Sequence, residues 1–192
     1  MRSMGCWKRI VAVILIAATT LLSVGIQVNT AYAAPSISGD DLLPSLTSSV
    51  VHVDEESRCI SKISAGTTVE QFFSYLDYSE AVVVYKGNEV VSDDTPLGTG
   101  MLVRIIDGDA FIKTYTVIVT GDTSGDGKIT ITDMIAVKAH ILKKDMLAGV
   151  YETAADVAGQ TGGGDGKVTI TDFIKVKAHI LKKETITGVT AK

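Results

Sequence analysis

The sequence predicts an α+β protein in two parts. A small, mostly antiparallel β module with one helix is followed by an all-α region made of two loop–helix repeats. Two observations predict this division. Apolar and polar residues alternate in short runs between residues 50 and 120, as in half-buried strands. Residues 128–144 then recur 39 positions later as residues 167–183. The differences between the two copies are Ile129/Val168, Met134/Phe173 and Ala136/Lys175.

Residues 1–33 have the features of a secretory signal peptide. Arg2, Lys8 and Arg9 form a positive n-region, residues 10–26 are largely apolar, and residues 31–33, Ala-Tyr-Ala, fit the cleavage rule. A retained membrane anchor is the alternative, which the short apolar run and the cleavage site disfavour. We therefore expect a secreted protein, extracellular or part of a cell-surface assembly, with no membrane attachment after cleavage.

The mature chain expected from this cleavage is acidic. Loss of three basic residues leaves 15 Lys and Arg against 22 Asp and Glu, which gives a net charge of −7. This balance argues against nucleic acid as a partner. Only Cys59 remains, so no intramolecular disulfide can form. Small exported domains without disulfides often use a metal for stability instead.

Residues 34–49 are polar and Ser-rich with two prolines, which predicts a flexible lead-in. The module at residues 50–120 follows. Its strands are expected at residues 50–53, 59–63, 81–85, 89–91, 101–106 and 111–120. The last strand runs into Gly121 without a Pro- or Ser-rich linker, so we expect the two parts to be rigidly coupled and to share an interface.

One helix is expected inside the module. Thr67 and Glu70 match a capping box, in which both side chains satisfy free backbone donors. Val69 begins an apolar stripe at i, i+3, i+4 and i+7, which indicates a two-turn helix with one buried face. No nucleophile-elbow or metal-protease motif occurs, and the module is far smaller than usual catalytic domains, so we expect no enzyme.

The loop before the first repeated helix has oxygen-bearing residues at alternate positions. Calcium prefers roughly six to eight hard oxygens, and a loop of about twelve residues supplies them from positions 1, 3, 5, 7, 9 and 12, with glycine at position 6. Gly127 stands at position 6. The predicted ligands are Asp122, Ser124, Asp126, the Lys128 carbonyl, Thr130 and Asp133. The loop therefore predicts a calcium site.

This loop differs from an EF-hand in two ways. Position 12 is Asp in place of Glu, and the preceding residues alternate like a strand, so the incoming helix is missing. With G-D-x-x-G-D-G-K-I-x-x-x-D at residues 121–133 and G-D-G-K-V-x-x-x-D at residues 164–172, the chain resembles the type I dockerin family over about residues 121–188. The resemblance implies an all-α dockerin domain at residues 121–192, which docks calcium-dependently onto a cohesin module of a scaffoldin in a cellulosome-like assembly.

The second loop departs from the family pattern. Counting back from Asp172, the retained ligand positions are Asp165, the Lys167 carbonyl and Thr169. Positions 1 and 3 then fall on Thr161 and Gly163, whereas family members continue directly from the Ala-Asp-Val segment into the loop. Asp156 is the alternative first ligand, if the residues in between bulge out. We expect calcium to be bound firmly by the first loop and weakly by the second.

The resemblance also implies a partner surface, because dockerins bind cohesins through loop positions 10 and 11 and the following helix. The matching residues are Ile131, Thr132, Lys138 and His140, and in the second repeat Ile170, Thr171, Lys177 and His179. Exposed apolar anchors ringed by polar groups suit an interface. A solvated face is the alternative for the His and Lys residues. The near-identity of the two helices implies two binding modes related by a half-turn.

The opposite helix faces are expected to pack in a core. Their residues are Met134, Val137, Ile141 and Leu142, and in the second repeat Phe173, Val176, Ile180 and Leu181. The role of the first module stays open between a structural neighbour of the dockerin and a carbohydrate-binding or small enzymatic cargo in polysaccharide catabolism. A free-standing, calcium-stabilised extracellular protein without a cohesin partner is the third hypothesis.

Overall fold

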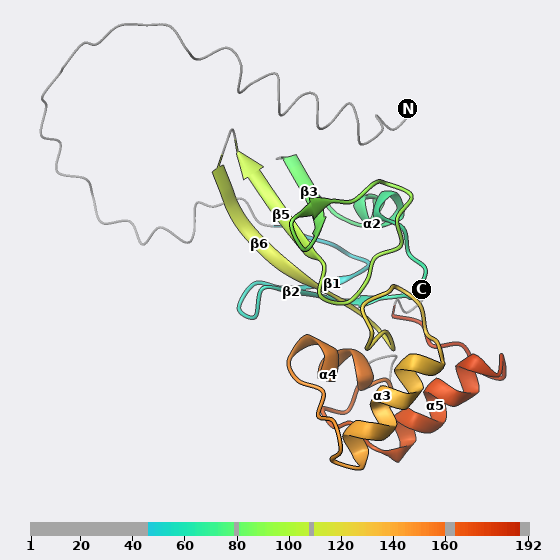
Figure 1. The fold of residues 1–192 in the computed structure, drawn as a ribbon. Coiled ribbons are helices and arrows are strands. Elements are labelled where there is room, and N and C mark those ends of the chain that lie inside the picture. The colour runs from blue at the N-terminus through green and yellow to red at the C-terminus, as the bar shows by residue number, and fades with distance from the viewer. Residues whose placement is uncertain (1–45, 79–80, 108–109, 160–163, 189–192) are drawn as a thin grey trace, which may run out of the picture.

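The computed structural model describes residues 46–78, 81–107, 110–159 and 164–188. The predicted signal peptide and most of the predicted lead-in lie outside these ranges. Figure 1 shows a sheet module with one helix, and below it a C-terminal region with three helices. No helix among the described residues has the length and apolar character needed to span a membrane.

The sheet of the first module has the strand order β1-β2-β6-β5-β3-β4. The strands are β1 (His52–Asp54), β2 (Cys59–Ile63), β3 (Ala81–Lys86), β4 (Glu89–Val90), β5 (Leu102–Asp107) and β6 (Ala110–Val119). β2 pairs with β6 in parallel, and the other neighbours pair antiparallel. The ten-residue β6 lies between β2 and β5 and leads directly into the C-terminal region.

Helix α2 (Val69–Ser74) buries Val69 and Phe72 in the core of the module. The expected capping box is wrong by one residue: it is formed by Thr68 and Gln71. The helix begins at Val69, so Thr68 is its N-cap, and the hydroxyl of Thr67 donates to the Ser64 carbonyl oxygen at 2.8 Å.

The packed module reaches back into the segment predicted to be a lead-in. Leu46 is only 2% exposed and belongs to the same core as α2. The backbone N–H of Asp77 donates to the Thr47 carbonyl oxygen at 2.8 Å, so this segment is hydrogen-bonded to the end of the helix region.

The C-terminal region contains α3 (Ile131–Ile141), α4 (Val150–Ala155) and α5 (Ile170–Ile180). α3 and α5 pack against each other, and Val137 and Val176 are fully buried at equivalent positions. Each of these two helices begins at a Thr N-cap, Thr130 or Thr169.

The expectation of an all-α C-terminal region is wrong. The expectation of a mostly antiparallel sheet in the first module is incomplete, because the sheet is mixed. The structure consists of one six-stranded mixed sheet and, within the described residues, four short helices. The C-terminal region is only partly helical, because long irregular loops precede α3 and α5. Gly125 and Gly127 in the first of these loops have φ of 77° and 80°, values that interrupt any helix.

The two parts of the molecule share an interface. The Gly66 N–H donates to the Gly127 carbonyl oxygen at 2.9 Å, and β6 of the first module packs against α4 of the C-terminal region. Near the C-terminus the Gly188 N–H donates to the Ser64 hydroxyl oxygen at 3.0 Å. The first module therefore contacts both the entry and the exit of the C-terminal region.

Candidate metal centre

The first loop is organised around the Asp122 carboxylate, which is fully buried. Its Oδ1 accepts from the backbone N–H groups of Gly125 at 2.7 Å and Asp126 at 3.2 Å. Its Oδ2 accepts from the N–H of Gly127 at 2.9 Å and from that of Thr99, in the first module, at 2.9 Å. These four backbone donors fix the orientation of the carboxylate at the start of the loop.

Asp133 closes the loop from the first turn of α3, and it too is fully buried. Its Oδ1 accepts from the N–H groups of Thr123 and Ser124, both at 2.9 Å. Its Oδ2 accepts from the N–H of Thr130 at 2.8 Å, which completes the capping box of α3. The start of the helix and the shape of the loop therefore depend on one carboxylate.

The donor set of the first loop fits calcium by its chemistry. Asp122, Asp126 and Asp133 supply carboxylates, and Ser124 and Thr130 supply hydroxyls, all hard oxygens of the kind that calcium takes. Asp126 and Ser124 are exposed. In the part of the chain that the structure describes, no group of three His, Cys, Asp or Glu side chains is already gathered around one point.

The second loop has the same hydrogen-bond frame. Asp156 Oδ1 accepts from the Asp165 N–H at 3.0 Å and its Oδ2 from the Gly166 N–H at 2.6 Å, as Asp122 does from Asp126 and Gly127. Asp172 Oδ1 accepts from the N–H groups that follow Asp156, those of Val157 at 2.8 Å and Ala158 at 2.7 Å. Of the two registers open from the sequence, this geometry corresponds to the one with Asp156 at position 1. Thr161 and Gly163 lie outside the described residues.

The other predicted ligands of the second loop, Asp165, Lys167 and Thr169, make the same contacts as their equivalents in the first loop. The Thr169 N–H and hydroxyl donate to Asp172 Oδ2 at 2.7 and 3.1 Å, as Thr130 does to Asp133. Asp165 accepts from the N–H of Lys167 at 3.1 Å, which repeats the contact of Asp126 with Lys128. Three carboxylates, one hydroxyl and one carbonyl are therefore available in both loops.

Two differences separate the loops. Ala158 stands where the first loop has Ser124, so the third position has no side-chain oxygen. The second loop is also more open: a hollow of about 350 Å³ lies beside it, lined by Glu152, Thr153, Asp156, Gly166, Lys167 and Val168. Burial raises the pKa of the Asp156 carboxyl, and the nearby Asp172 and Asp165 raise it further. A bound cation would relieve this repulsion.

The predicted partner-binding residues fall into two groups. Ile131 and Ile170 are 60% and 59% exposed. The others at the surface are Thr132, Lys138, Thr171 and Lys177. His140 is buried and His179 half-buried. Their Nδ1 atoms accept from the backbone N–H groups of Leu147 and Ile186, each at 3.0 Å, so both imidazoles hold the segment that follows their helix.

Four further apolar residues lie on the same helix faces. Ile135 and Ile174 are 58% and 57% exposed, and Leu142 and Leu181 are 52% and 54% exposed. The two leucines were expected in the core, and that expectation is wrong because the helices end just before them, at Ile141 and Ile180. The helical period from Ile131 would have found Ile135 at i+4.

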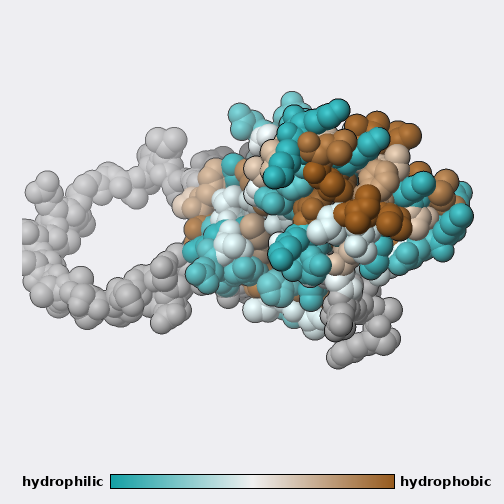
Figure 2. Space-filling view, turned by 90° about the horizontal axis from the view of Figure 1, so that it is seen from below, coloured by the Kyte–Doolittle hydropathy of each residue, from teal (hydrophilic) through white to brown (hydrophobic). Residues whose placement is uncertain are grey.

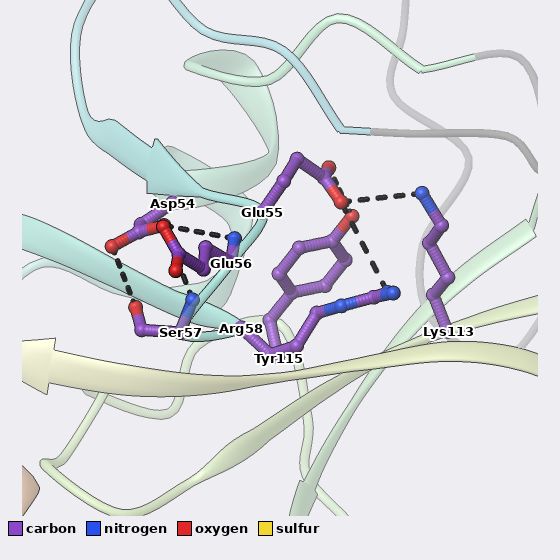
Figure 3. Close-up of polar contacts among 7 residues, drawn as sticks. All are labelled: Asp54, Glu55, Glu56, Ser57, Arg58, Lys113 and Tyr115. Atoms are coloured by element: carbon purple, nitrogen blue, oxygen red, sulfur yellow. Dashed lines mark hydrogen bonds and ion pairs between the residues drawn. The ribbon is translucent and has the colours of Figure 1, made fainter. Parts of the chain in front are cut away.

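A polar cluster in the first module, in which the exposed Glu55 meets the buried Lys113 and Tyr115, was also missed (Figure 3). The Tyr115 hydroxyl donates to Glu55 at 2.5 Å and the Lys113 ammonium to the same carboxylate at 3.2 Å. Burial raises the pKa of the Glu55 carboxyl, but the hydrogen bonds from Tyr115 and Lys113, together with nearby positive charge, lower it further than burial raises it. The pKa of Glu55 therefore lies below its usual value. Burial, with the bond to Glu55, raises the pKa of Tyr115 to about 12. The cluster fastens the β1–β2 turn to β6; its sequence signal was the lysine inside an apolar strand.

Comparison with known proteins gives one match. Residues 120–181 match the family model described as Dockerin type I domain. No curated protein and no solved structure was found to match the chain. The matched range begins at the end of β6 and includes both loops together with α3, α4 and α5.

Proposed function

Residues 120–181 are a type I dockerin domain, and from this premise we propose that the chain is a secreted docking protein that binds a cohesin module of a scaffoldin. Dockerin domains bind cohesin modules in a calcium-dependent manner, in cellulosome-type assemblies, and are docking modules without catalytic activity. Proteins that contain them are typically extracellular. Export through a signal peptide at residues 1–33 is part of the proposal.

The observation that carries the proposal is a duplicated apolar surface. We call it the docking face and define it by Ile131, Ile135, Lys138 and Leu142 with their equivalents Ile170, Ile174, Lys177 and Leu181. Within each repeat these residues are spaced i, i+4, i+7 and i+11, which places the first three on one side of the helix and the leucine at its C-cap. Figure 2 shows hydrophobic residues gathered on the side where Figure 1 places these helices.

The composition of the docking face suits a protein partner. Its six aliphatic side chains are each more than half exposed, whereas soluble proteins usually expose large apolar residues singly. Thr132 and Thr171 are exposed beside them, together with the two lysines, and provide a polar rim. Because equivalent residues of the two repeats have nearly equal exposure, either repeat can present the same anchors. This equality supports two docking orientations.

Calcium holds the face in shape in this proposal. The first loop would bind it through Asp122, Asp126 and Asp133 with the neighbouring oxygens, and the second through Asp156, Asp165 and Asp172 without an oxygen at position 3. Both helices begin within these loops, at Thr130 and Thr169. Neutralising the carboxylates therefore stabilises the first turn of each helix, where the docking face begins. The missing oxygen supports a weaker second site.

Calorimetric titration against a panel of type I cohesin modules tests the proposal. We expect binding in calcium and none with EDTA. Ile135→Asp or Ile174→Asp alone should weaken binding only a few-fold, because the other orientation remains, whereas the double variant should lose at least about a hundredfold. Phe111→Asp is the matched control, since Phe111 is 57% exposed on the first module.

Two results would contradict this function. The absence of calcium-dependent binding to any cohesin would favour the free-standing protein. Full affinity in the double variant would remove the docking face from the interface. A glycan array tests the cargo hypotheses separately: we propose a structural module because its contacts with the dockerin are extensive, and binding to any glycan would favour a carbohydrate-binding cargo.

A further inference from the structure

The first loop is hydrogen-bonded to the N-terminal module, whereas the equivalent aspartate of the second loop, Asp156, accepts from amides of its own loop. We infer that residues 97–99 of the module are a positioning element of the first calcium site, which orients the Asp122 carboxylate and thereby sets the calcium affinity of that loop. The inference rests on the proposed function only in that the first loop must bind calcium. It concerns how this chain modifies one of its two loops.

The central contact joins Thr99 to Asp122. The Thr99 backbone N–H donates to Asp122 Oδ2 at 2.9 Å, and the two residues are 3% and 0% exposed. The donor is itself held by the sheet. The Thr99 hydroxyl accepts from the Val119 N–H at 3.1 Å and lies 3.3 Å from the Val119 carbonyl oxygen. The last residue of β6 therefore fixes the position of a group that hydrogen-bonds to the first ligand of the loop.

The backbones of the module and the loop also meet directly. A Cβ atom added at Gly98 would lie 2.3 Å from the Gly125 carbonyl oxygen, and one at Gly127 would lie 2.5 Å from the Leu97 carbonyl oxygen. No side chain fits at either position. With the bond from Gly66 to Gly127, the module contacts the turn glycine of the loop from two directions. The conformation that presents the ligands is therefore held from outside the loop.

The second loop provides an internal reference. Asp156 accepts from Asp165 and Gly166, which belong to its own loop. A Cβ atom added at Gly166 would meet nothing within 4 Å, in contrast to its equivalent Gly127. A ligand that is already oriented loses less freedom on binding, and outer hydrogen bonds of this kind commonly change metal affinity by about ten- to a hundredfold. The module should give this advantage to the first loop alone.

Gly98→Ala tests the inference, because the added methyl group would push against the Gly125 backbone. The two sites are measured separately in the full chain: Asp165→Asn leaves the first loop to be titrated with calcium, and Asp126→Asn leaves the second. Both aspartates are exposed and equivalent. We expect Gly98→Ala to raise the dissociation constant of the first loop about tenfold and to leave that of the second unchanged. Gly87→Ala, in the β3–β4 turn, is the control for loss of module stability.

A measurement on the unsubstituted chain is independent of whether the variant folds. The amide resonance of Thr99 should shift on addition of calcium and exchange more slowly with solvent, and Asp126→Asn should abolish both changes. Equal weakening of both loops by Gly98→Ala, or a Thr99 amide that does not respond to calcium bound at the first loop, would overturn the inference. Failure of the unsubstituted chain to bind calcium would instead overturn the proposed function.

Discussion

The two loops of the dockerin domain have the same frame in different surroundings. The first aspartate of each loop, Asp122 or Asp156, accepts from an Asp-Gly pair of N–H groups later in the loop. The aspartate in the first helical turn, Asp133 or Asp172, accepts from the N–H groups of the two residues that follow the first aspartate. Asp122 precedes Asp126 by four residues, whereas Asp156 precedes Asp165 by nine. Equivalent pairs of carboxylates therefore make the same hydrogen bonds in two loops of different length.

Beyond these shared hydrogen bonds, the two loops differ in length, in their ligand oxygens and in the groups around them. The longer second loop costs little in closure entropy, because this cost grows only slowly with length. It lacks an oxygen at position 3 and borders an open hollow. The first loop is shorter, and the module contacts it at Asp122, Gly125 and Gly127. The residues of each loop therefore provide the shared hydrogen bonds, and residues 97–99 of the first module distinguish the first loop from the second.

Removal of calcium should lower the stability of the chain more than any substitution, and it should show the difference between the two loops most clearly. With calcium at about a thousand times its dissociation constant, chelation should lower the free energy of unfolding by about 4 kcal/mol. Hydrogen exchange after EDTA should increase first at Val157 and Ala158, while Thr123 and Ser124 stay protected by the module. Simultaneous loss of protection would show that the module contributes nothing to the first loop.

The second-largest effect should be the difference in stability between the Asp122→Ala and Asp156→Ala variants. In EDTA, Asp122→Ala leaves buried donors from both parts of the molecule without a partner and should cost on the order of 3 kcal/mol. Asp156→Ala frees donors that reach solvent and should cost about 1 kcal/mol. Urea denaturation measures both, with the exposed Asp126→Ala as the reference. Equal losses would contradict the asymmetry.

Ala158→Ser should bring the second loop closer to the first. It restores the hydroxyl that Ser124 provides, and we expect the calcium affinity of the second loop to rise several-fold. Calorimetry in the Asp126→Asn background measures this site alone, and the first loop, read in the Asp165→Asn background, should not change. An unaltered second site would mean that Ala158 is not at the third ligand position.

Tyr115→Phe should have the smallest effect and should leave both loops unchanged. Loss of the bond to Glu55 should cost about 1 kcal/mol at neutral pH. Because the pKa of Tyr115 in the fold is raised from 10.0 to about 12, its stabilisation is complete below pH 10 and is lost as the pH rises through about 12. Thermal unfolding between pH 9 and 12 should therefore show a steeper loss in the unsubstituted chain than in the variant.

Local patterns predicted the strands and the helix of the first module and the repeated helices, but they missed α4 and the contacts between distant segments. The alternation near β5 and the stripe in α2 need only neighbouring residues. The choice between Thr67 and Thr68 as N-cap depended on where the helix begins, and the parallel pairing of β2 with β6 depended on the whole chain.

The candidate site shows the same limit. The ligand types of the first loop are evident from spacing, but the register of the second loop depended on which aspartate the Asp165 and Gly166 amides reach. The contact from Thr99 had no sequence signal at all, because every residue except proline offers the same backbone donor.

The position of β6 has a mechanical consequence. This strand lies between β2 and β5, and its end runs directly into the dockerin domain. A pull on a docked dockerin would act along the strand, across hydrogen bonds that lie roughly perpendicular to it. These bonds would be loaded in shear and would share the force, in contrast to a strand peeled from an edge. In single-molecule pulling through a bound cohesin, we expect β6 to stay in the sheet until its bonds to β2 and β5 break together.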